Sequence, residues 1–366
     1  MNVPFVDLHA QYLRIKAEID QAIASVIENS AFIRGSRVEA FEQEYAQYLG
    51  VEHCVSCASG TDALYLVLKQ LGVGPGDEVI TTAHSWISTS SMISQVGAKV
   101  VFCDTDPGTF TLDPAKARAL ITPKTKGIVP VHLYGQAADM PRIMALAEEY
   151  GLWVLEDCAQ AHLATCGGRL VGTFGQAAIF SFYPGKNLGA MGDAGCVVTA
   201  DGDLSERIAL FARHGGKGTH SIEGVNSRMD GLQAAILSAK LPHLAQWTEE
   251  RRQIAAHYDS LLAGVPQVRT PRIAPGRDHV YHLYVILSER RDELRQFLKS
   301  RGIATALHYP TILPLLPAYA RFGHTEGDFP VALGHQTGML SLPMYPELQE
   351  GQAAYVAAAI REFHQA

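Results

Sequence analysis

The segment 181–189 has the sequence Ser181-Phe182-Tyr183-Pro184-Gly185-Lys186-Asn187-Leu188-Gly189, which places one lysine in a glycine-rich turn straight after an apolar strand. A lysine amine that condenses with an aldehyde cofactor has to be partly desolvated and rigidly held, because a fully solvated ammonium at neutral pH is not a nucleophile. The turn around Lys186 offers such a position, so this lysine is the candidate nucleophile.

An acidic group follows the short buried strand that we expect over 152–155. In open parallel sheets the ligand crevice lies at the carboxyl ends of the strands, so Asp157 would point into a binding site. A carboxylate beside a pyridine nitrogen keeps that nitrogen protonated and makes the ring an electron sink. The amide of Gln160 could hydrogen-bond the phenolic oxygen of the same cofactor. Lys186, Asp157 and Gln160 together predict a pyridoxal-phosphate enzyme; the alternative is a strand-end acid that caps a helix, with Lys186 solvated in a loop.

A phosphate seat is expected at the first strand-to-helix turn, Ser59-Gly60-Thr61. The turn lies between an expected strand over 54–57 and an expected helix over 63–71, so backbone amides and the helix dipole favour an anion there. Ordinary N-capping by Ser59 or Thr61 is the alternative.

Motifs spread almost from end to end make the chain resemble one family, the DegT/DnrJ/StrS-type pyridoxal-phosphate-dependent nucleotide-sugar aminotransferases. The branch that acts on 3-keto-hexoses is the most similar. The matching stretches are Val3-Pro4-Phe5-Val6-Asp7-Leu8, Ser59-Gly60-Thr61-Asp62-Ala63-Leu64, Gly74-Pro75-Gly76-Asp77-Glu78-Val79-Ile80, Val131-His132-Leu133-Tyr134-Gly135-Gln136, 156–162, 181–195, Asn226-Ser227-Arg228-Met229-Asp230, Gln233-Ala234-Ala235 and His308-Tyr309-Pro310.

The resemblance implies an α/β fold of the aspartate-aminotransferase type (fold type I), with a mostly parallel sheet, flanking helices and a smaller C-terminal α/β domain. Strand-like and helix-like segments alternate up to about residue 150, which independently favours a mostly parallel sheet. We expect a large cofactor-binding domain over 1–245 and a small C-terminal domain over 246–366. A long polar helix is expected over 232–262 and a strand over 281–287.

The resemblance also implies how the cofactor phosphate is held. Gly60, Thr61 and Ser181 would contact it, and Asn226 would reach it from the neighbouring subunit, so the active sites of a homodimer would be shared. Without the resemblance, Asn226 and Arg228 could equally cap the helix that follows them.

Trp86 is expected to stack on the pyridoxal ring, because the family places an aromatic side chain at this point and an indole offers a large flat surface. Its neighbours 82–89 are mostly small and polar, which favours this role over the alternative of a core tryptophan.

Substrate contacts are expected from His308, Tyr309, Tyr183 and Lys217. His308 and Tyr309 belong to a segment that resembles members aminating carbon 3 of the hexose, with glutamate as the amino donor. A histidine packed under a proline and a solvated lysine are the alternatives for His308 and Lys217. The chain departs from common family patterns at Cys158, Leu163 and Cys166, which puts the identity of the sugar in doubt.

Composition agrees with an enzyme of this kind. The chain has 366 residues with 47% hydrophobic content, enough for a large core and about two domains. The formal net charge is -7 and the sequence shows no basic patch, so no nucleic-acid partner is expected. The start of the chain has no signal-like segment, and no apolar run has membrane-spanning length, so we expect the cytoplasm and no membrane. Scattered cysteines, of which Cys54 and Cys57 have CxxC spacing without a second pair, predict buried thiols and no metal.

Four other functions compete with this hypothesis. Amination of carbon 4 is the main alternative within the family. A non-catalytic pyridoxal-phosphate-binding regulator belongs to a different class and predicts bound cofactor without transamination. A related dehydratase branch carries histidine in place of the lysine, and a dehydrogenase needs a strand-linked GxGxxG, so Lys186 and the lack of that motif count against both.

Overall fold

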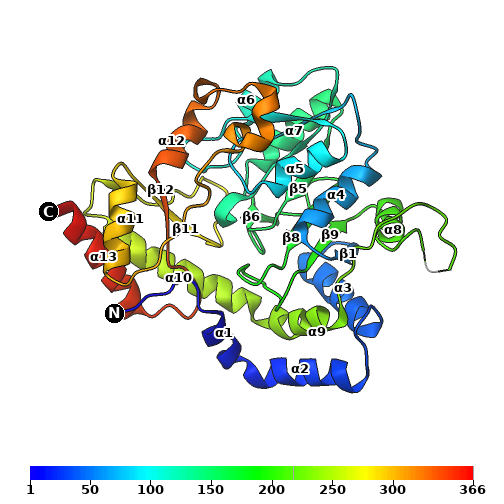
Figure 1. Cartoon of the computed structure of the whole chain (residues 1–366), viewed down its shortest axis with the longest axis horizontal. Coiled ribbons are helices and arrows are strands. Elements are labelled where there is room, and N and C mark those ends of the chain that lie inside the picture. Colours follow the sequence, from blue (N-terminus) through cyan, green and yellow to red (C-terminus); the bar gives the residue numbers. More distant parts are fainter. Residues whose placement is uncertain (217, 366) are drawn as a thin grey trace.

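The computed structural model describes residues 1–216 and 218–365. Its elements form one large and two small sheets with helices packed around them (Figure 1). The α-helices are α1 (Leu8–Arg14), α2 (Lys16–Glu28), α3 (Ser36–Leu49), α4 (Gly60–Gln70), α5 (Ser88–Gln95), α6 (Pro114–Ala119), α7 (Met140–Tyr150), α8 (Gly202–Phe211), α9 (Gly231–Lys240), α10 (Leu244–Leu262), α11 (Arg291–Ser300), α12 (Pro330–Gly338) and α13 (Glu350–Gln365).

The strands are β1 (His53–Cys57), β2 (Glu78–Thr82), β3 (Lys99–Cys103), β4 (Thr125–Val129), β5 (Trp153–Asp157), β6 (Thr165–Cys166), β7 (Arg169–Leu170), β8 (Ala177–Ser181), β9 (Gly195–Thr199), β10 (Val268–Arg269), β11 (Tyr284–Ser288) and β12 (Met339–Leu342). Short 3₁₀ turns are η1 (Leu133–Gly135), η2 (Leu241–His243), η3 (Leu313–Leu315), η4 (Pro317–Phe322) and η5 (Glu326–Asp328).

The larger sheet has the strand order β1-β9-β8-β5-β4-β2-β3. Strand β9 runs antiparallel to both of its neighbours, and the other strand pairs are parallel. This confirms the expected α/β fold with a mostly parallel sheet. Because β1, β2, β5 and β8 point the same way, the loops that follow them meet at one edge of the sheet.

Both faces of this sheet are buried, as near-continuous apolar strands require. Alternate residues of a strand point to opposite faces, so Ile179 and Phe180 of β8 belong to two different core clusters. Helices α3, α7 and α9 cover the face with Phe180, and α4, α5 and α8 cover the other. Full burial of a side chain such as Phe180 contributes about 1.5–3 kcal/mol.

The smaller antiparallel sheet, β10-β11-β12, carries α10, α11 and α13 on one face. Its other face presents Val285 and Leu287 to Phe110 and Tyr134 of the larger unit. Both chain ends lie on this side of the molecule in Figure 1. Val3 pairs with Ile303 and packs among the C-terminal helices, so the N-terminal residues lie with the smaller sheet. The boundary at 245/246 stays a prediction; it falls at the start of α10.

The long helix expected over 232–262 is interrupted. Helix α9 ends at Lys240, and the 3₁₀ turn η2 contains Pro242 before α10 begins. Proline lacks an amide hydrogen and its ring clashes with the preceding turn, which explains the break. The strand expected over 281–287 begins three residues later, at Tyr284.

Candidate active site

The loops at the carboxyl-end edge of the larger sheet bring most of the predicted site residues together. Ser59, Gly60 and Thr61 follow β1, Trp86 follows β2, Asp157 ends β5 with Gln160 in the next turn, and Ser181 ends β8 ahead of Lys186. The chain order of these residues is dispersed, but the parallel topology places the strand ends side by side.

Lys186 is held in a tight turn. Its backbone amide donates to the Tyr183 carbonyl at 2.8 Å. A Cβ at Gly189 would lie 2.2 Å from the Pro184 carbonyl oxygen, so only glycine lets the turn close. Burial lowers the pKa of Lys186 from its usual 10.5 to about 8, although the negative charge of Asp157 acts in the opposite direction. Lys186 is half-buried, which does not fit the alternative of a freely solvated lysine.

Asp157 is a buried carboxylate with partners on both oxygens. Thr89 Oγ1 donates to Oδ2 at 2.7 Å, and the Ala159 amide donates to Oδ1 at 3.1 Å. Burial raises the pKa of Asp157, and these two donors and the Lys186 ammonium pull it back down. The segment after Asp157 is a turn, so it does not cap a helix as the alternative required. Thr89 was missed because it is 68 residues away in the chain.

Three histidines near Lys186 are neutral, since their burial and the lysine charge both disfavour a second cation. The pKa falls to about 4 at His162 and at His308, and well below its usual value at His282. His162 Nε2 donates to the Ser181 carbonyl at 3.0 Å, which leaves Nδ1 to accept from the Tyr45 hydroxyl at 2.8 Å. His162 therefore links the end of β8, the strand that precedes the lysine turn, to α3.

The Ser59-Gly60-Thr61 turn is built at the N-terminus of α4. Ser59 Oγ accepts from the Asp62 amide at 3.1 Å and caps the helix, so the capping alternative is correct for Ser59. Thr61 Oγ1 lies 2.7 Å from Ser88 Oγ. A Cβ at Gly60 would lie 2.8 Å from Ser181 Cβ, which shows how closely this turn approaches β8. Helix dipole and amide donors at this point suit an anion.

Asn226 is exposed and lies beside this turn through its neighbour Ser227. Ser227 Oγ donates to Asp62 Oδ2 at 2.6 Å and accepts from the Ala58 amide at 3.2 Å. The cap of α9 is Asp230, which accepts from the Gln233 amide at 2.8 Å, so Asn226 does not cap the following helix. The same holds for Arg228. Lys217 lies outside the described residues.

An aromatic wall borders the site. Trp86 is 55% exposed, which excludes a core tryptophan, and its ring centre lies 5.4 Å from that of Tyr309. Gln160 Oε1 accepts from the Tyr134 amide at 2.7 Å and its Nε2 donates to the Tyr309 hydroxyl at 3.0 Å. One Nε2 hydrogen of Gln160 remains for a further acceptor.

His308 and Tyr183 flank this wall. His308 Nδ1 pairs with Ser341 Oγ at 2.8 Å, and its ring stacks on that of Phe5 with the ring centres 5.7 Å apart. Tyr183 is 60% exposed beside the lysine turn. Both side chains are therefore placed where they could meet a ligand.

One buried cluster has the composition of a metal site, His132 with Glu156 and Cys158. His132 Nδ1 accepts from the Ala138 amide, so Nε2 carries the hydrogen and donates to Glu156 at 3.1 Å. Glu156 also accepts from the amides of residues 172, 174 and 175. Every ligand atom of this pair already has a protein partner, and the cluster serves as a structural brace.

The residues at the sheet edge fit pyridoxal phosphate. They provide a lysine with a lowered pKa, a buried carboxylate and a helix N-terminus with closely packed glycine, which suit the aldehyde, the ring nitrogen and the phosphate of that cofactor in turn. The fold and this site define a pyridoxal-phosphate aminotransferase type of protein.

Comparison with known proteins gives the family. The model of the DegT/DnrJ/EryC1/StrS aminotransferase family matches residues 13–361. A Geobacillus stearothermophilus protein named "Pleiotropic regulatory protein" is 49% identical over 100% of this chain and 99% of its own length. A Streptomyces venezuelae protein named "dTDP-3-amino-3,4,6-trideoxy-alpha-D-glucose transaminase" is 46% identical, over 99% of this chain and 96% of its own length.

A solved structure agrees with these relatives. The crystal structure of S. venezuelae DesV in complex with a ketimine intermediate matches with a TM-score of 0.97 at 45% identity, covering 100% of this chain and 99% of that one. This chain belongs to the DegT/DnrJ/EryC1/StrS aminotransferase family. The resemblance in its motifs is thereby confirmed, and its cofactor is pyridoxal phosphate.

Proposed function

We propose that this protein transfers an amino group from glutamate to carbon 3 of a nucleotide-linked keto-sugar, for the synthesis of a polysaccharide or glycoside. The observation that carries the proposal is Lys186 with its lowered pKa, set beside Asp157 at the same sheet edge as the Ser59-Gly60-Thr61 turn. The S. venezuelae relative, named as a transaminase of a 3-amino sugar, supports carbon 3. Among the described residues no helix is long and apolar enough to span a membrane, and we propose that the enzyme works in the cytoplasm.

Bound pyridoxal phosphate supplies an electron sink for the carbon that gives up its proton. Lys186 accepts and returns that proton at Nζ, and its pKa of about 8 keeps a useful neutral fraction at physiological pH. Asp157 holds a negative charge where the ring nitrogen carries a positive one. Thr89 and Ala159 fix the direction of this carboxylate.

Binding residues are proposed around this pair. Gly60, Thr61 and Ser181 hold the phosphate in the α4 N-terminal seat, and Asn226 reaches it from the partner of a homodimer. The exposed indole of Trp86 would cover one face of the cofactor ring, and Gln160 would donate its remaining Nε2 hydrogen to the phenolic oxygen.

Tyr183, His308 and Tyr309 meet the sugar in this proposal, and Lys217 adds a positive charge for the diphosphate. Tyr309 is positioned by Gln160 and His308 by Ser341, so each polar end is oriented before substrate arrives.

A regulator that binds the cofactor without turnover is the second candidate, because the Geobacillus relative carries a regulatory name. The two functions differ in one measurement, the visible absorption of the purified protein before and after glutamate. An enzyme has a yellow band that bleaches with glutamate and returns when a nucleotide-linked 3-keto-sugar is added. A band that glutamate leaves unchanged favours the regulator, and a band that only a 4-keto-sugar restores moves the reaction to carbon 4.

Replacement Lys186→Ala should abolish turnover, lowering it by at least about 100-fold, because it removes the group to which the proton transfer is assigned. Transaminase activity and the visible spectrum of the variant check this. The exposed Lys124→Ala is the control and should behave as the wild type. A K186A protein that still transaminates would refute the assignment.

A further inference from the structure

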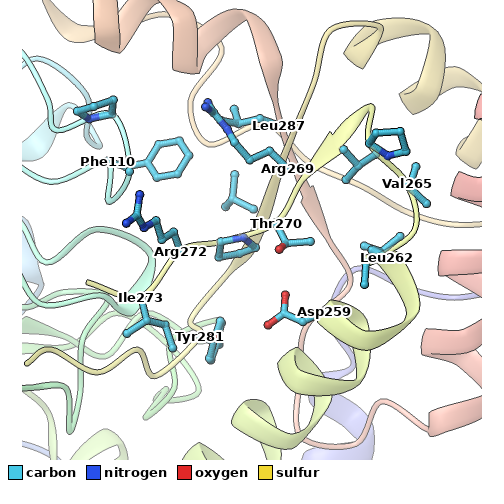
Figure 2. Close-up of a pocket in the computed structure, with 17 residues that line it drawn as sticks. Phe110, Asp259, Leu262, Val265, Arg269, Thr270, Arg272, Ile273, Tyr281 and Leu287 are labelled. Carbon is cyan, nitrogen blue, oxygen red and sulfur yellow. The ribbon is translucent and has the colours of Figure 1, made fainter. Parts of the chain in front are cut away.

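A cavity of about 820 Å³ opens between the smaller sheet and the larger unit (Figure 2). It lies between the C-terminal end of α10, the segment 265–273, strand β11 and the loop 107–110 that follows β3. Apolar side chains such as Leu262, Val265 and Leu287 form most of its lining. Its volume lies in the range of cavities that bury ligands of drug or nucleotide size, about 300–1,000 Å³.

The wall formed by loop 107–110 is firmly built. Asp106 Oδ1 accepts from the amides of Gly108 and Thr109, each at 2.9 Å. The ring centres of Phe110 and His335 are 4.0 Å apart. His335 is neutral, because burial lowers its pKa to about 4; its Nε2 donates to the Pro107 carbonyl at 3.3 Å.

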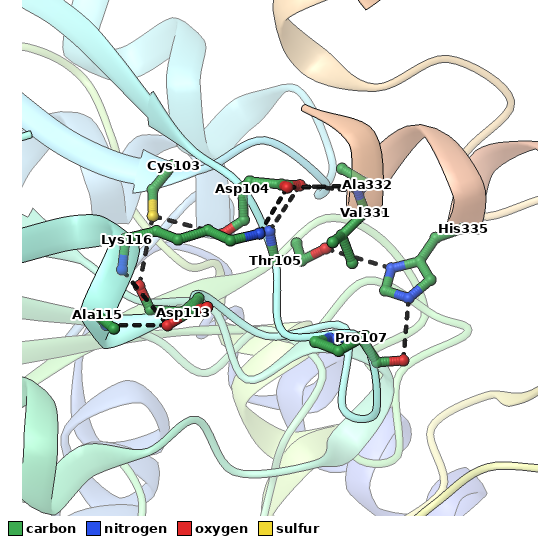
Figure 3. Close-up of polar contacts among 10 residues, drawn as sticks. All are labelled: Cys103, Asp104, Thr105, Pro107, Asp113, Ala115, Lys116, Val331, Ala332 and His335. Atoms are coloured by element: carbon green, nitrogen blue, oxygen red, sulfur yellow. Dashed lines mark hydrogen bonds and ion pairs between the residues drawn. The ribbon is translucent and has the colours of Figure 1, made fainter. Parts of the chain in front are cut away.

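Helix α12, which carries His335, is itself anchored beside this loop (Figure 3). Asp104 accepts from the first amides of α12, Ala332 at 2.8 Å and Val331 at 3.2 Å, and pairs with Lys116 at 2.7 Å. The aromatic wall of the cavity is therefore held in place before any ligand arrives.

The opposite wall carries two guanidinium groups, Arg269 and Arg272. In Figure 2 both turn toward the side of the cavity where Phe110 lies. Two observations place both arginines near the 107–110 loop. A Cβ on Gly108 would lie 3.7 Å from Arg272 Cδ, and the positive charge of Arg269 helps to lower the pKa of His335. Neither arginine forms an ion pair with any residue that the structure describes.

The single acidic group in the lining does not cancel these charges. Asp259 Oδ1 accepts from the Tyr284 hydroxyl at 2.5 Å. Burial raises the pKa of Asp259, and its hydrogen bonds with the Tyr284 and Thr270 hydroxyls act in the opposite direction. Two guanidinium groups against one occupied carboxylate leave the cavity electropositive.

The cavity is distinct from the lysine site. No residue of its lining belongs to the set around Lys186 and Asp157. The cluster of Leu133, Tyr134 and Leu283 packs between the two, with Phe110 on the cavity side and Tyr309 on the other.

We propose that this cavity is a second ligand site that takes a nucleoside diphosphate, free or sugar-linked. The guanidinium groups of Arg269 and Arg272 are both exposed at the cavity lining. A guanidinium group binds phosphate oxygens through bidentate, charge-assisted hydrogen bonds, and Arg is preferred over Lys for that purpose. An aromatic ring beside them, on a preformed wall, suits a nucleobase. The cavity site stands on its own geometry, whereas the second nucleotide counted in the test rests on the nucleotide-linked substrate proposed for Lys186.

The test is calorimetric titration of the holoenzyme with UDP and with dTDP, in wild type and in Arg269→Gln/Arg272→Gln. We expect two nucleotides per chain in the wild type and one in the variant, whose binding at the lost site weakens by on the order of tenfold or more. Transaminase activity and the melting temperature should not change. The exposed pair on α11, Arg295→Gln/Lys299→Gln, removes the same charge elsewhere and should still bind two.

Other results of this titration would distinguish binding in the cavity from binding at the Lys186 site. Stoichiometry that is the same in wild type and in the arginine variant overturns the proposal. The wild type could also bind one nucleotide per chain and the variant none. That result supports the cavity site and counts against a nucleotide-linked substrate at Lys186. If inorganic pyrophosphate binds the cavity as tightly as UDP does, the proposal that the ligand is a nucleotide is overturned, because the nucleobase then contributes nothing to the affinity. A UDP-linked sugar that binds more tightly than UDP identifies the sugar-linked form.

Discussion

Burial sets the ionisation of the two central side chains. Lys186 and Asp157 lie in the same desolvated edge of the sheet, and burial lowers the pKa of the lysine and raises that of the carboxylate. Each charge stabilises the other, so the pair resists part of that shift. The result is an amine that loses its proton in the physiological range.

The pH dependence of cofactor binding should follow from this shift. Combination of the apoenzyme with pyridoxal phosphate needs neutral Lys186, so its rate should rise through a midpoint near pH 8. Stopped-flow absorbance between pH 6 and 10 measures it. Asp157→Asn removes the charge that raises the lysine pKa and should move the midpoint to lower pH. A midpoint near that of free lysine, about 10.4, would contradict the burial argument.

At the same scale, sequence pattern predicted Lys186 and Asp157 as site residues, because each lies at or soon after the end of a recognisable strand, and the family resemblance added Trp86. It could not identify Thr89 or His282, whose neighbours come from strands and loops far along the chain. A hydrogen bond that spans 68 residues leaves no local signature.

Among the elements, the N-terminus of α4 combines a helix cap with a very close approach to β8. A Cβ at Gly60 would lie 2.8 Å from Ser181 Cβ and 3.3 Å from Ser181 Cα, so one of the two segments has to move. The proposed phosphate seat therefore depends on close packing between α4 and β8.

Gly60→Ala should lower the free energy of unfolding by about 1–3 kcal/mol through overpacking, and weaken retention of the cofactor. Urea unfolding and dialysis against buffer without cofactor measure the two effects. Gly351→Ala is the matched control, since it lies in the first turn of α13 with open space around its Cβ position. Equal behaviour of the two variants would show that the contact with Ser181 is unimportant.

The anchor of α12 is the second element with a measurable effect. Burial by itself would raise the pKa of Asp104, but Lys116 and three backbone amides outweigh it, so the pKa lies below its usual value. A carboxylate of this kind stabilises the fold above its unfolded pKa of about 3.9, and the effect is lost as the pH falls through the folded value.

Asp104→Asn should therefore cost about 1–3 kcal/mol at pH 7, from the lost charge-assisted hydrogen bonds. The difference from wild type should stay constant down to about pH 5 and shrink below about pH 4. Urea midpoints at several pH values check this, with the exposed Asp203→Asn as control. A difference that does not change with pH would rule out the carboxylate charge as its source.

For the whole molecule, the proposed sharing of the active site between two chains has a direct test. In the proposed dimer, each site takes Lys186 from one subunit and Asn226 from the other. Lys186→Ala and Asn226→Asp therefore damage a site through different subunits. If a mixture pairs at random, half of the dimers carry one intact site, and about a quarter of wild-type activity should return. Activity after subunit exchange measures it, and a mixture no more active than its parts would place Asn226 in its own subunit's site or outside the site.

The hydrophobic pattern and turn residues of the sequence by themselves determined the order of strands and helices, the mostly parallel sheet and the lysine turn, because periodicity and turn chemistry act over a few residues. The break at Pro242 was within reach of the same rules, since the proline is visible in the sequence. The protonation of Lys186, the Thr89–Asp157 bond and the arginine-lined cavity were decided only by the tertiary structure. Desolvation and hydrogen bonding depend on which distant segments pack together, and local sequence carries no record of that.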